Sequence, residues 1–262
     1  MEILRTGRAQ FEVEQSGNGP DLVLLHSLLT DLRSFAAIVP ALSRSRRVTL
    51  VSLPGFGRST PAGPSIEDSA DRLAQLLAAL GGKPDVLGNG YGGFIALALA
   101  ARHGEKLGKL VLADTGAAFP EAGRAPFRAM AEAVEKTGVA AIVDTAVRRI
   151  FPEAYLATHP EAISERKEVL LRANPVHFAA ACRALAKVDL RPELGRVANP
   201  TLVVVGALDA ATPPALAHEL AAGIPRAKLV ELPGCGHCPP LQQPAEFVAA
   251  ISPFLRLAEH DP

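Results

Sequence analysis

The feature that most constrains the fold is a regular alternation of short apolar runs, rich in Val and Leu, with longer segments of helical pattern. Strands that alternate with helices form a mostly parallel sheet with helices on both faces, so the chain is predicted to be an α/β protein. An earlier segment of alternating polarity, Ala9–Gln15, predicts a half-exposed edge strand. The runs that predict the other strands are Leu22–Leu25, Val48–Leu53, Val86–Leu87, Leu110–Ala113, Leu202–Val205 and Lys228–Leu232.

One interval interrupts this alternation. Residues 121–189 show only amphipathic helical pattern, broken by prolines at positions 152, 160 and 175. We interpret the interval as a helical lid inserted into a core formed by residues 1–120 and 190–262, lying over the carboxyl ends of the strands, where open parallel sheets bind ligands. The helices predicted within the core are about Arg33–Leu42, Ile66–Leu80, Tyr91–His103, Pro214–Ala222 and Ala245–Leu257.

Composition narrows the class of partner. The 262 residues include 27 basic and 27 acidic side chains, so the formal charge is zero and the field expected of a nucleic-acid or membrane-surface binder is absent. A small molecule is the expected partner. The first 17 residues lack a signal-peptide core, no 18 apolar residues run together, and the cysteine count is odd, which predicts a soluble protein of the cytoplasm.

A glycine-rich turn carries the most chemical information. Residues 87–94 read L-G-N-G-Y-G-G-F, directly after a strand and before a helix. As written, Gly88, Gly90 and Gly93 spell G-x-G-x-x-G, and Asp114 closes the next strand about 20 residues later, which is typical of dinucleotide binding. With a serine at position 90, the segment would instead be a nucleophile elbow, the sharp strand-turn-helix of hydrolases.

The surrounding loops favour the elbow. A dinucleotide fingerprint usually opens its domain, whereas about 80 residues, with strands of their own, precede this turn. The segment H-S-L-L-T-D at 26–31 follows a buried strand, where an acyl-transfer site takes a backbone N–H for its oxyanion hole. Downstream, Asp209 follows a strand and His237 lies in a glycine loop after the last strand, so the order is elbow, acid, histidine.

With these motifs in this order, the chain resembles the α/β-hydrolases over nearly its whole length. Within that superfamily it is most similar to the 3-oxoadipate enol-lactonase group, through residues 26–33, 174–182, 189–191 and 200–204. The resemblance implies an eight-stranded, mostly parallel sheet, hydrolysis of an ester or lactone, and no metal or organic cofactor. It also implies that Asp209 orients His237, that His237 is the general base, and that the N–H groups of Leu28 and Tyr91 form the oxyanion hole.

The chain departs from that family at the nucleophile, because the family's serine falls on Gly90. Glycine tolerates a strained turn, so the fold is expected to survive, but loss of a triad nucleophile costs on the order of a million-fold in rate. This form is therefore expected to be inactive or strongly impaired. Three explanations stay open: a deliberate Ser→Gly change, a natural protein that has abandoned covalent catalysis, and chemistry that needs no nucleophile. A hydrolase-like protein that binds its ligand without turnover is the rival class.

Several other residues admit two interpretations. Residues 235–238, C-G-H-C, could be a dithiol or metal motif, but their place in the histidine loop favours the hydrolase. Asp114 could be an alternative acid, although a strand-end carboxylate capping residues 115 and 116 is the preferred interpretation, and His26 is expected to bond only backbone.

The resemblance to enol-lactonases also implies a small anionic substrate. Burial of an unpaired carboxylate is costly, so such a substrate needs a cationic partner in the site. The candidates in this sequence are Arg33, Arg148 and Arg149.

Overall fold

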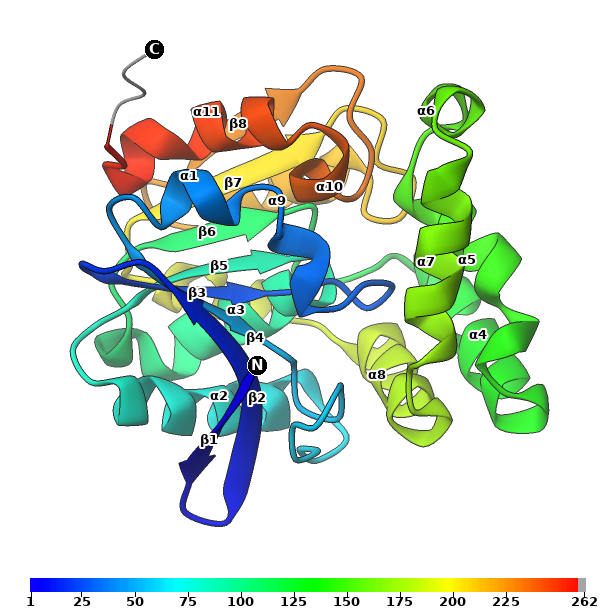
Figure 1. The fold of residues 1–262 in the computed structure, drawn as a ribbon, viewed down its shortest axis with the longest axis horizontal. Helices are drawn as coiled ribbons and strands as arrows, with labels where there is room; N and C mark the ends of the chain where they lie inside the picture. The colour runs from blue at the N-terminus through cyan, green and yellow to red at the C-terminus, as the bar shows by residue number, and fades with distance from the viewer. Residues whose placement is uncertain (259–262) are drawn as a thin grey trace.

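A computed structural model describes residues 1–258, and its centre is an eight-stranded sheet (Figure 1). The strand order is β1-β2-β4-β3-β5-β6-β7-β8; the β1–β2 and β2–β4 pairs are antiparallel, and every pair from β4–β3 to β7–β8 is parallel. The predicted α/β class and mostly parallel sheet are confirmed. The strands are β1 (Glu2–Thr6), β2 (Ala9–Ser16), β3 (Asp21–Leu25), β4 (Arg47–Val51), β5 (Asp85–Asn89), β6 (Leu110–Ala113), β7 (Thr201–Gly206) and β8 (Lys228–Leu232).

The edge of the sheet differs from the prediction. The segment Ala9–Gln15 lies in β2, which is not an edge strand, because β1 pairs along its outer side from Glu2 opposite Val13 to Thr6 opposite Ala9. The sequence pattern missed β1 because its five residues, E-I-L-R-T, show no clean alternation. Gly7, with a φ of 59°, supplies the left-handed backbone of the tight turn between the two strands.

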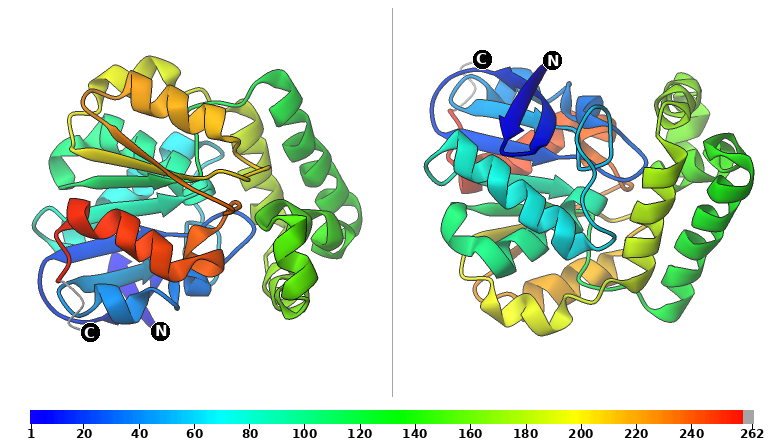
Figure 2. Two further views of the ribbon diagram at one scale, coloured as in Figure 1. Left: turned by 90° about the horizontal axis from the view of Figure 1, so that it is seen from above. Right: turned by 90° about the horizontal axis from the view of Figure 1, so that it is seen from below.

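Two layers of helix cover the sheet because alternate strand residues point to opposite faces (Figure 2). Val23 and Leu25 pack in one cluster with α2, α3 and α9, and Leu22 and Leu24 pack in another with α1 and α11. Helix α3 is buried on all sides from Tyr91 to Ala101, which fits its position against the central strands. The helices of the core are α1 (Val39–Leu42), α2 (Ile66–Leu80), α3 (Tyr91–His103), α9 (Pro214–Gly223), α10 (Pro239–Gln242) and α11 (Pro244–Leu255), with 3-10 turns at Leu32–Phe35, Gly104–Lys106 and Arg191–Arg196.

The helix predicted over Arg33–Leu42 is broken. Asp31 caps a 3-10 turn by accepting a hydrogen bond from the Arg33 N–H, and α1 begins only at Val39. Pro40 lacks an N–H and cannot continue a preceding helix, but it is tolerated in the first turn of a new one. The helices predicted at Ile66–Leu80 and Tyr91–His103 are observed with those bounds.

Between β6 and β7 the chain forms a separate helical layer, which we call the helical insertion (residues 121–187). Figure 1 places it beyond the carboxyl ends of the strands. Its two ends are tied together where Ala118 and Asp189 form an isolated antiparallel bridge and the Leu190 N–H donates to the Ala117 carbonyl at 2.8 Å. Its helices are α4 (Glu121–Thr137), α5 (Val143–Ile150), α6 (Glu153–Thr158), α7 (Glu161–Leu171) and α8 (Pro175–Lys187), with a 3-10 turn at Val139–Ala141.

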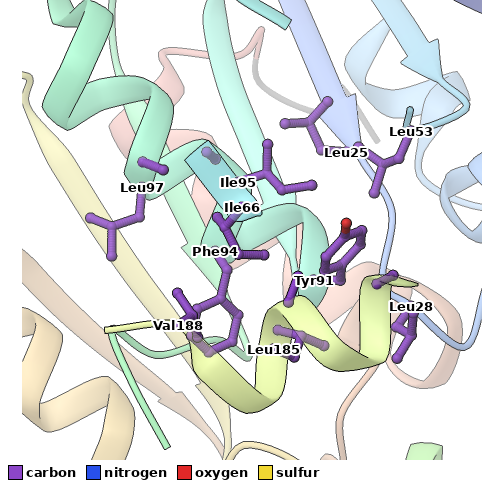
Figure 3. Close-up of a cluster of buried hydrophobic side chains, with 14 of the residues drawn as sticks. Leu25, Leu28, Leu53, Ile66, Tyr91, Phe94, Ile95, Leu97, Leu185 and Val188 are labelled. Carbon is purple, nitrogen blue, oxygen red and sulfur yellow. The ribbon is translucent and has the colours of Figure 1, made fainter. Parts of the chain in front are cut away.

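The insertion packs directly onto the core. Leu185 and Val188, at the end of α8, lie beside Phe94 of α3, and Leu28 lies near the same helix (Figure 3). All four side chains are buried. No helix within residues 1–258 is long and apolar enough to cross a lipid bilayer.

Candidate active site

The turn between β5 and α3 has the sharp geometry of an elbow. Gly90 adopts a φ of 54° and a ψ of −119°, a conformation that strains any residue with a side chain. A Cβ atom at Gly88 would lie 2.3 Å from the Gly92 carbonyl oxygen, and one at Gly92 would lie 2.3 Å from the Leu25 carbonyl oxygen. Both neighbours must therefore be glycine for the turn to pack, as the elbow interpretation requires.

The loops after β7 and β8 bring the acid and the histidine together. The Nδ1 atom of His237 lies 2.9 Å from Oδ2 of Asp209, and both side chains are buried. Asp209 also accepts hydrogen bonds from the Ala211 N–H at 2.7 Å and from the Thr212 hydroxyl at 2.6 Å. Burial alone would raise the pKa of Asp209, but the charge of His237 and the hydrogen bonds from His237 and Thr212 hold it below its usual value.

The other ring nitrogen of His237 faces the predicted elbow. A Cβ atom at position 90 would lie 2.8 Å from His237 Nε2 and 2.4 Å from the hydroxyl oxygen of Ser27. In the present chain, Ser27 Oγ itself lies 3.1 Å from His237 Nε2. Position 90, Asp209 and His237, predicted together from the sequence, thus meet at the carboxyl end of the sheet.

The two N–H groups predicted for the oxyanion hole lie beside the same point. Leu28 and Tyr91 line one pocket with Gly90 and His237. Among the hydrogen bonds of residues 1–258, neither backbone N–H donates to a protein acceptor. The Gly92 N–H donates to the His26 carbonyl at 3.0 Å, which ties the loop after β3 to the start of α3. Both groups are thus free to bind a developing negative charge.

His26 holds this loop in place, as predicted for a structural histidine. Its Nδ1 donates to the Ser27 carbonyl at 2.8 Å, and its Nε2 accepts from the Leu53 N–H at 3.2 Å. Burial lowers the pKa of His26, so the ring is neutral and can donate through one nitrogen while accepting through the other.

The pocket above Gly90 is narrow and mostly apolar, with a cavity of about 20 Å³. A larger cavity of about 340 Å³ lies on the other side of Leu28, but Gly90 and His237 are not among its lining residues. We place the chemistry in the narrow pocket because its walls contain the acid-linked imidazole. Its apolar walls are Leu29, Phe94, Phe119, Phe127, Met130 and Leu185.

The structure separates the three candidate arginines. Arg149 lines the narrow pocket, and its guanidinium carbon lies 6.0 Å from the centre of the Phe127 ring. Burial lowers the pKa of Arg149 while the charge of Asp209 opposes that change, and Arg149 has no ion pair among residues 1–258. Arg33 is exposed and borders the larger cavity, and Arg148 is exposed on α5. Only Arg149 is therefore placed to meet a ligand beside Gly90.

Sequence reasoning missed two polar contacts of the site. Thr212 bonds the carboxylate of Asp209, and its position three residues after the acid is a spacing that turn-forming acids often use. Asn89 donates from Nδ2 to the His237 carbonyl at 3.1 Å and accepts from the Cys238 thiol at 3.1 Å. Asn89 precedes the elbow directly, but no pattern in the sequence indicated that it would bond the histidine loop.

The predicted hydrogen-bond partners of Asp114 are wrong. Its Oδ1 accepts from the Gly206 N–H at 2.8 Å, so it bonds the end of β7 rather than capping residues 115 and 116. Burial and the adjacent negative charge of Asp209 raise the pKa of Asp114 well above its usual value. His237 bonds Asp209, so the geometry gives Asp209 the position of the acid.

The structure gives little support to a dithiol site, a metal site or a dinucleotide-binding turn. Burial raises the pKa of both Cys235 and Cys238, so neither is poised as the thiolate that dithiol chemistry uses. Within residues 1–258 no group of three or more His, Cys, Asp or Glu side chains is arranged to hold a metal ion. At the glycine turn, a Cβ atom at Gly90 would meet Ser27 and one at Gly92 would meet the Leu25 carbonyl, so contacts within the protein already account for these glycines.

Comparison with known proteins agrees with this geometry. The sequence model of the alpha/beta hydrolase fold matches residues 20–244. The chain is 35% identical to a pimeloyl-[acyl-carrier protein] methyl ester esterase of Chromobacterium violaceum, covering 93% of this chain and 97% of that protein. It is 28% identical to 3-oxoadipate enol-lactonase 2 of Acinetobacter baylyi, covering 90% and 89% of the two chains. The crystal structure of the enol-lactonase from Burkholderia xenovorans superimposes with a TM-score of 0.89 at 29% identity, covering 97% of this chain and all of that one.

Proposed function

Because the chain belongs to the alpha/beta hydrolase fold family, we propose that its pocket binds a small carboxylic ester or lactone and that its hydrolytic machinery is disabled at Gly90. The observation that carries this proposal is the 2.9 Å contact between Asp209 and His237, with the imidazole aimed at a residue that has no side chain. The relatives named as esterases and an enol-lactonase support the substrate class.

With serine at position 90, each neighbouring group would have a role. The hydroxyl would attack the substrate carbonyl, and His237 Nε2 would take its proton and later activate water. Ionised Asp209 would stabilise the imidazolium, and the N–H groups of Leu28 and Tyr91 would bind the oxyanion. Without that serine the covalent route through position 90 is closed, and the chain is strongly impaired as a hydrolase.

The helical insertion acts in this proposal as a lid. Phe127, Met130 and Leu185 come from α4 and α8 and form one wall of the narrow pocket, whereas the reacting groups come from the core. Exclusion of water from such a pocket strengthens the electrostatic interactions within it. Because α4 and α8 form this wall, the position of the insertion sets the space that a substrate can occupy beside Gly90.

Arg149 is proposed to bind a carboxylate of the substrate. It is the one of the three candidate arginines that lines the pocket, and most of the other lining residues are apolar. A charged hydrogen bond to a carboxylate would offset the cost of burying that anion. An anionic lactone is therefore the preferred substrate class within the proposed function.

The test is Gly90→Ser. We expect kcat/KM for a small activated ester, such as p-nitrophenyl acetate, to rise by at least about a thousand-fold, since a triad nucleophile contributes far more than this. Circular dichroism would establish that the variant is folded, and Gly90→Ala, which adds the Cβ without the hydroxyl, is the matched control. A folded Gly90→Ser protein with no gain would contradict the proposal and favour a ligand-binding protein without turnover.

A further inference from the structure

Ser27 already completes a hydroxyl–imidazole–carboxylate chain that does not involve residue 90. Its Oγ lies 3.1 Å from His237 Nε2, and His237 Nδ1 lies 2.9 Å from Asp209 Oδ2. Ionised Asp209 can only accept, so when the His237 ring is neutral its Nδ1 atom carries the proton and its Nε2 atom has a free lone pair. In that tautomer Ser27 is the donor, with its hydroxyl proton directed at the general base, as an activated serine requires.

This position of Ser27 depends on the glycine. A Cβ atom at residue 90 would come within 2.4 Å of Ser27 Oγ and 2.9 Å of Ser27 Cβ, and real atoms do not approach so closely. Any side chain at position 90 would push the Ser27 hydroxyl away from His237. The Ser27 hydroxyl can therefore contact the imidazole only when residue 90 has no side chain.

The backbone around Ser27 supplies what an attacking hydroxyl needs. The Leu28 N–H directly follows Ser27, as the Tyr91 N–H follows residue 90, and both N–H groups are unpaired within residues 1–258. The loop that carries Ser27 is fixed, because the Ser27 carbonyl accepts from His26 Nδ1 at 2.8 Å and from the Thr30 N–H at 3.2 Å. Ser27 also lines the narrow pocket beside Gly90.

We propose that Ser27 is a substitute nucleophile and carries the residual hydrolysis of this chain, an inference that rests on the proposed ester or lactone chemistry. Ser27 Oγ bonds to the substrate carbonyl carbon while its proton passes to His237 Nε2. The carbon–oxygen bond to the leaving alcohol then breaks, and that oxygen takes the proton from Nε2. Water next attacks the acyl carbon and gives a proton to Nε2; the bond between that carbon and Ser27 Oγ then breaks, Oγ takes the proton from Nε2, and the carboxylic acid leaves.

The experiment is acylation of the unaltered protein by p-nitrophenyl acetate, followed by mass spectrometry of its peptides. We expect one acetyl group on Ser27, and we expect Ser27→Ala to lose that group together with at least about tenfold of the residual rate. Ser34→Ala is the matched control, because Ser34 is another buried serine of the next turn and its hydroxyl has no partner within residues 1–258. An acetyl group found on His237 instead, or an unchanged rate in folded Ser27→Ala, would overturn the proposal.

Two further variants test the role of Ser27, and the combined results distinguish failure of this inference from failure of the proposed function. Ser27→Cys should retain acylation at position 27 as a thioester, whereas folded Gly90→Ala should lose acylation of Ser27 because the new Cβ displaces the hydroxyl. If Gly90→Ser becomes active but the unaltered protein is never acylated at Ser27, the inference fails and the proposed function stands. If Ser27 is acylated but Gly90→Ser gains nothing, the inference stands and the elbow proposal fails.

Discussion

The candidate active site has two sides, which we call its arms, and they differ in how many side chains each contributes to the site. On one arm, the loops after β7 and β8 hold Asp209 and His237 with a full set of hydrogen bonds from Thr212, Ala211 and Asn89. On the other arm, the turn after β5 supplies only backbone, and the hydroxyl that contacts His237 Nε2, that of Ser27, comes from the loop after β3. The sharp turn is thus encoded by the small neighbours at 88 and 92 and does not need a nucleophile to form.

The complete arm is expected to give the largest effect when it is broken. In the Gly90→Ser background, Asp209→Asn should lower kcat/KM by on the order of 10⁴, because an amide favours the wrong imidazole tautomer. The measurement is ester hydrolysis at neutral pH. Asp114→Asn in the same background is the control, since Asp114 does not bond His237, and its rate should stay within a few-fold. Equal losses in the two variants would mean that the acid is wrongly assigned.

Arg149 tests whether the pocket between the two arms selects an anion. In the serine-restored protein, Arg149→Ala should lower kcat/KM for a carboxylate-bearing lactone by about 10- to 100-fold, corresponding to a charged hydrogen bond of roughly 1.5–3 kcal/mol. The methyl ester of the same lactone should be little affected. Arg148→Ala is the matched control, because that side chain is exposed on the same helix. Equal hydrolysis of acid and methyl ester by the parent would instead indicate a general carboxylesterase.

Much of the backbone of both arms could be predicted, but the side-chain contacts could not. Helical pattern located α2 and α3 with their observed bounds, and the structure shows that Ser65 caps α2 and that the glycine turn precedes α3. The carboxyl ends of parallel strands meet at one edge, so the loop positions of Asp209 and His237 indicated a shared site. The Ser27–His237 contact joins residues far apart in the chain and depends on the absence of a side chain at Gly90. No local sequence pattern indicates such a contact.

Two buried carboxylates in the site should respond to pH with opposite signs. The pKa of Asp209 is lowered on folding, so its contribution to stability is present above about pH 4 and is lost as pH falls through the folded pKa. The pKa of Asp114 is raised by burial and by Asp209, so its contribution is present below about pH 4 and is lost as pH rises through the folded pKa.

Asp114→Asn isolates the second effect. Relative to the unaltered protein, we expect the variant to be more stable at pH 8 than at pH 4 by at least about 1 kcal/mol, the equivalent of one pKa unit. The carboxamide oxygen can still accept from the Gly206 N–H, and the cost of its unpartnered amide is the same at both pH values. Urea unfolding at the two pH values measures the difference. A constant offset between the proteins would show that folding does not raise the pKa of Asp114.

The smallest effect is expected at the cysteines that flank the complete arm. Both thiols are buried, and burial raises the pKa of each, so neither is available as a thiolate for the reaction. Cys238 nevertheless donates to Asn89, which in turn holds the His237 carbonyl, and a serine hydroxyl can replace that donor. In the Gly90→Ser background, Cys235→Ser combined with Cys238→Ser should therefore leave ester hydrolysis within a few-fold.

The control is Cys238→Ala, which removes the hydrogen-bond donor to Asn89 and should lower the rate more than Cys238→Ser. A folded double serine variant that has lost activity would show that the thiols take part in the chemistry itself, and the histidine loop would then have to be reinterpreted as a dithiol site.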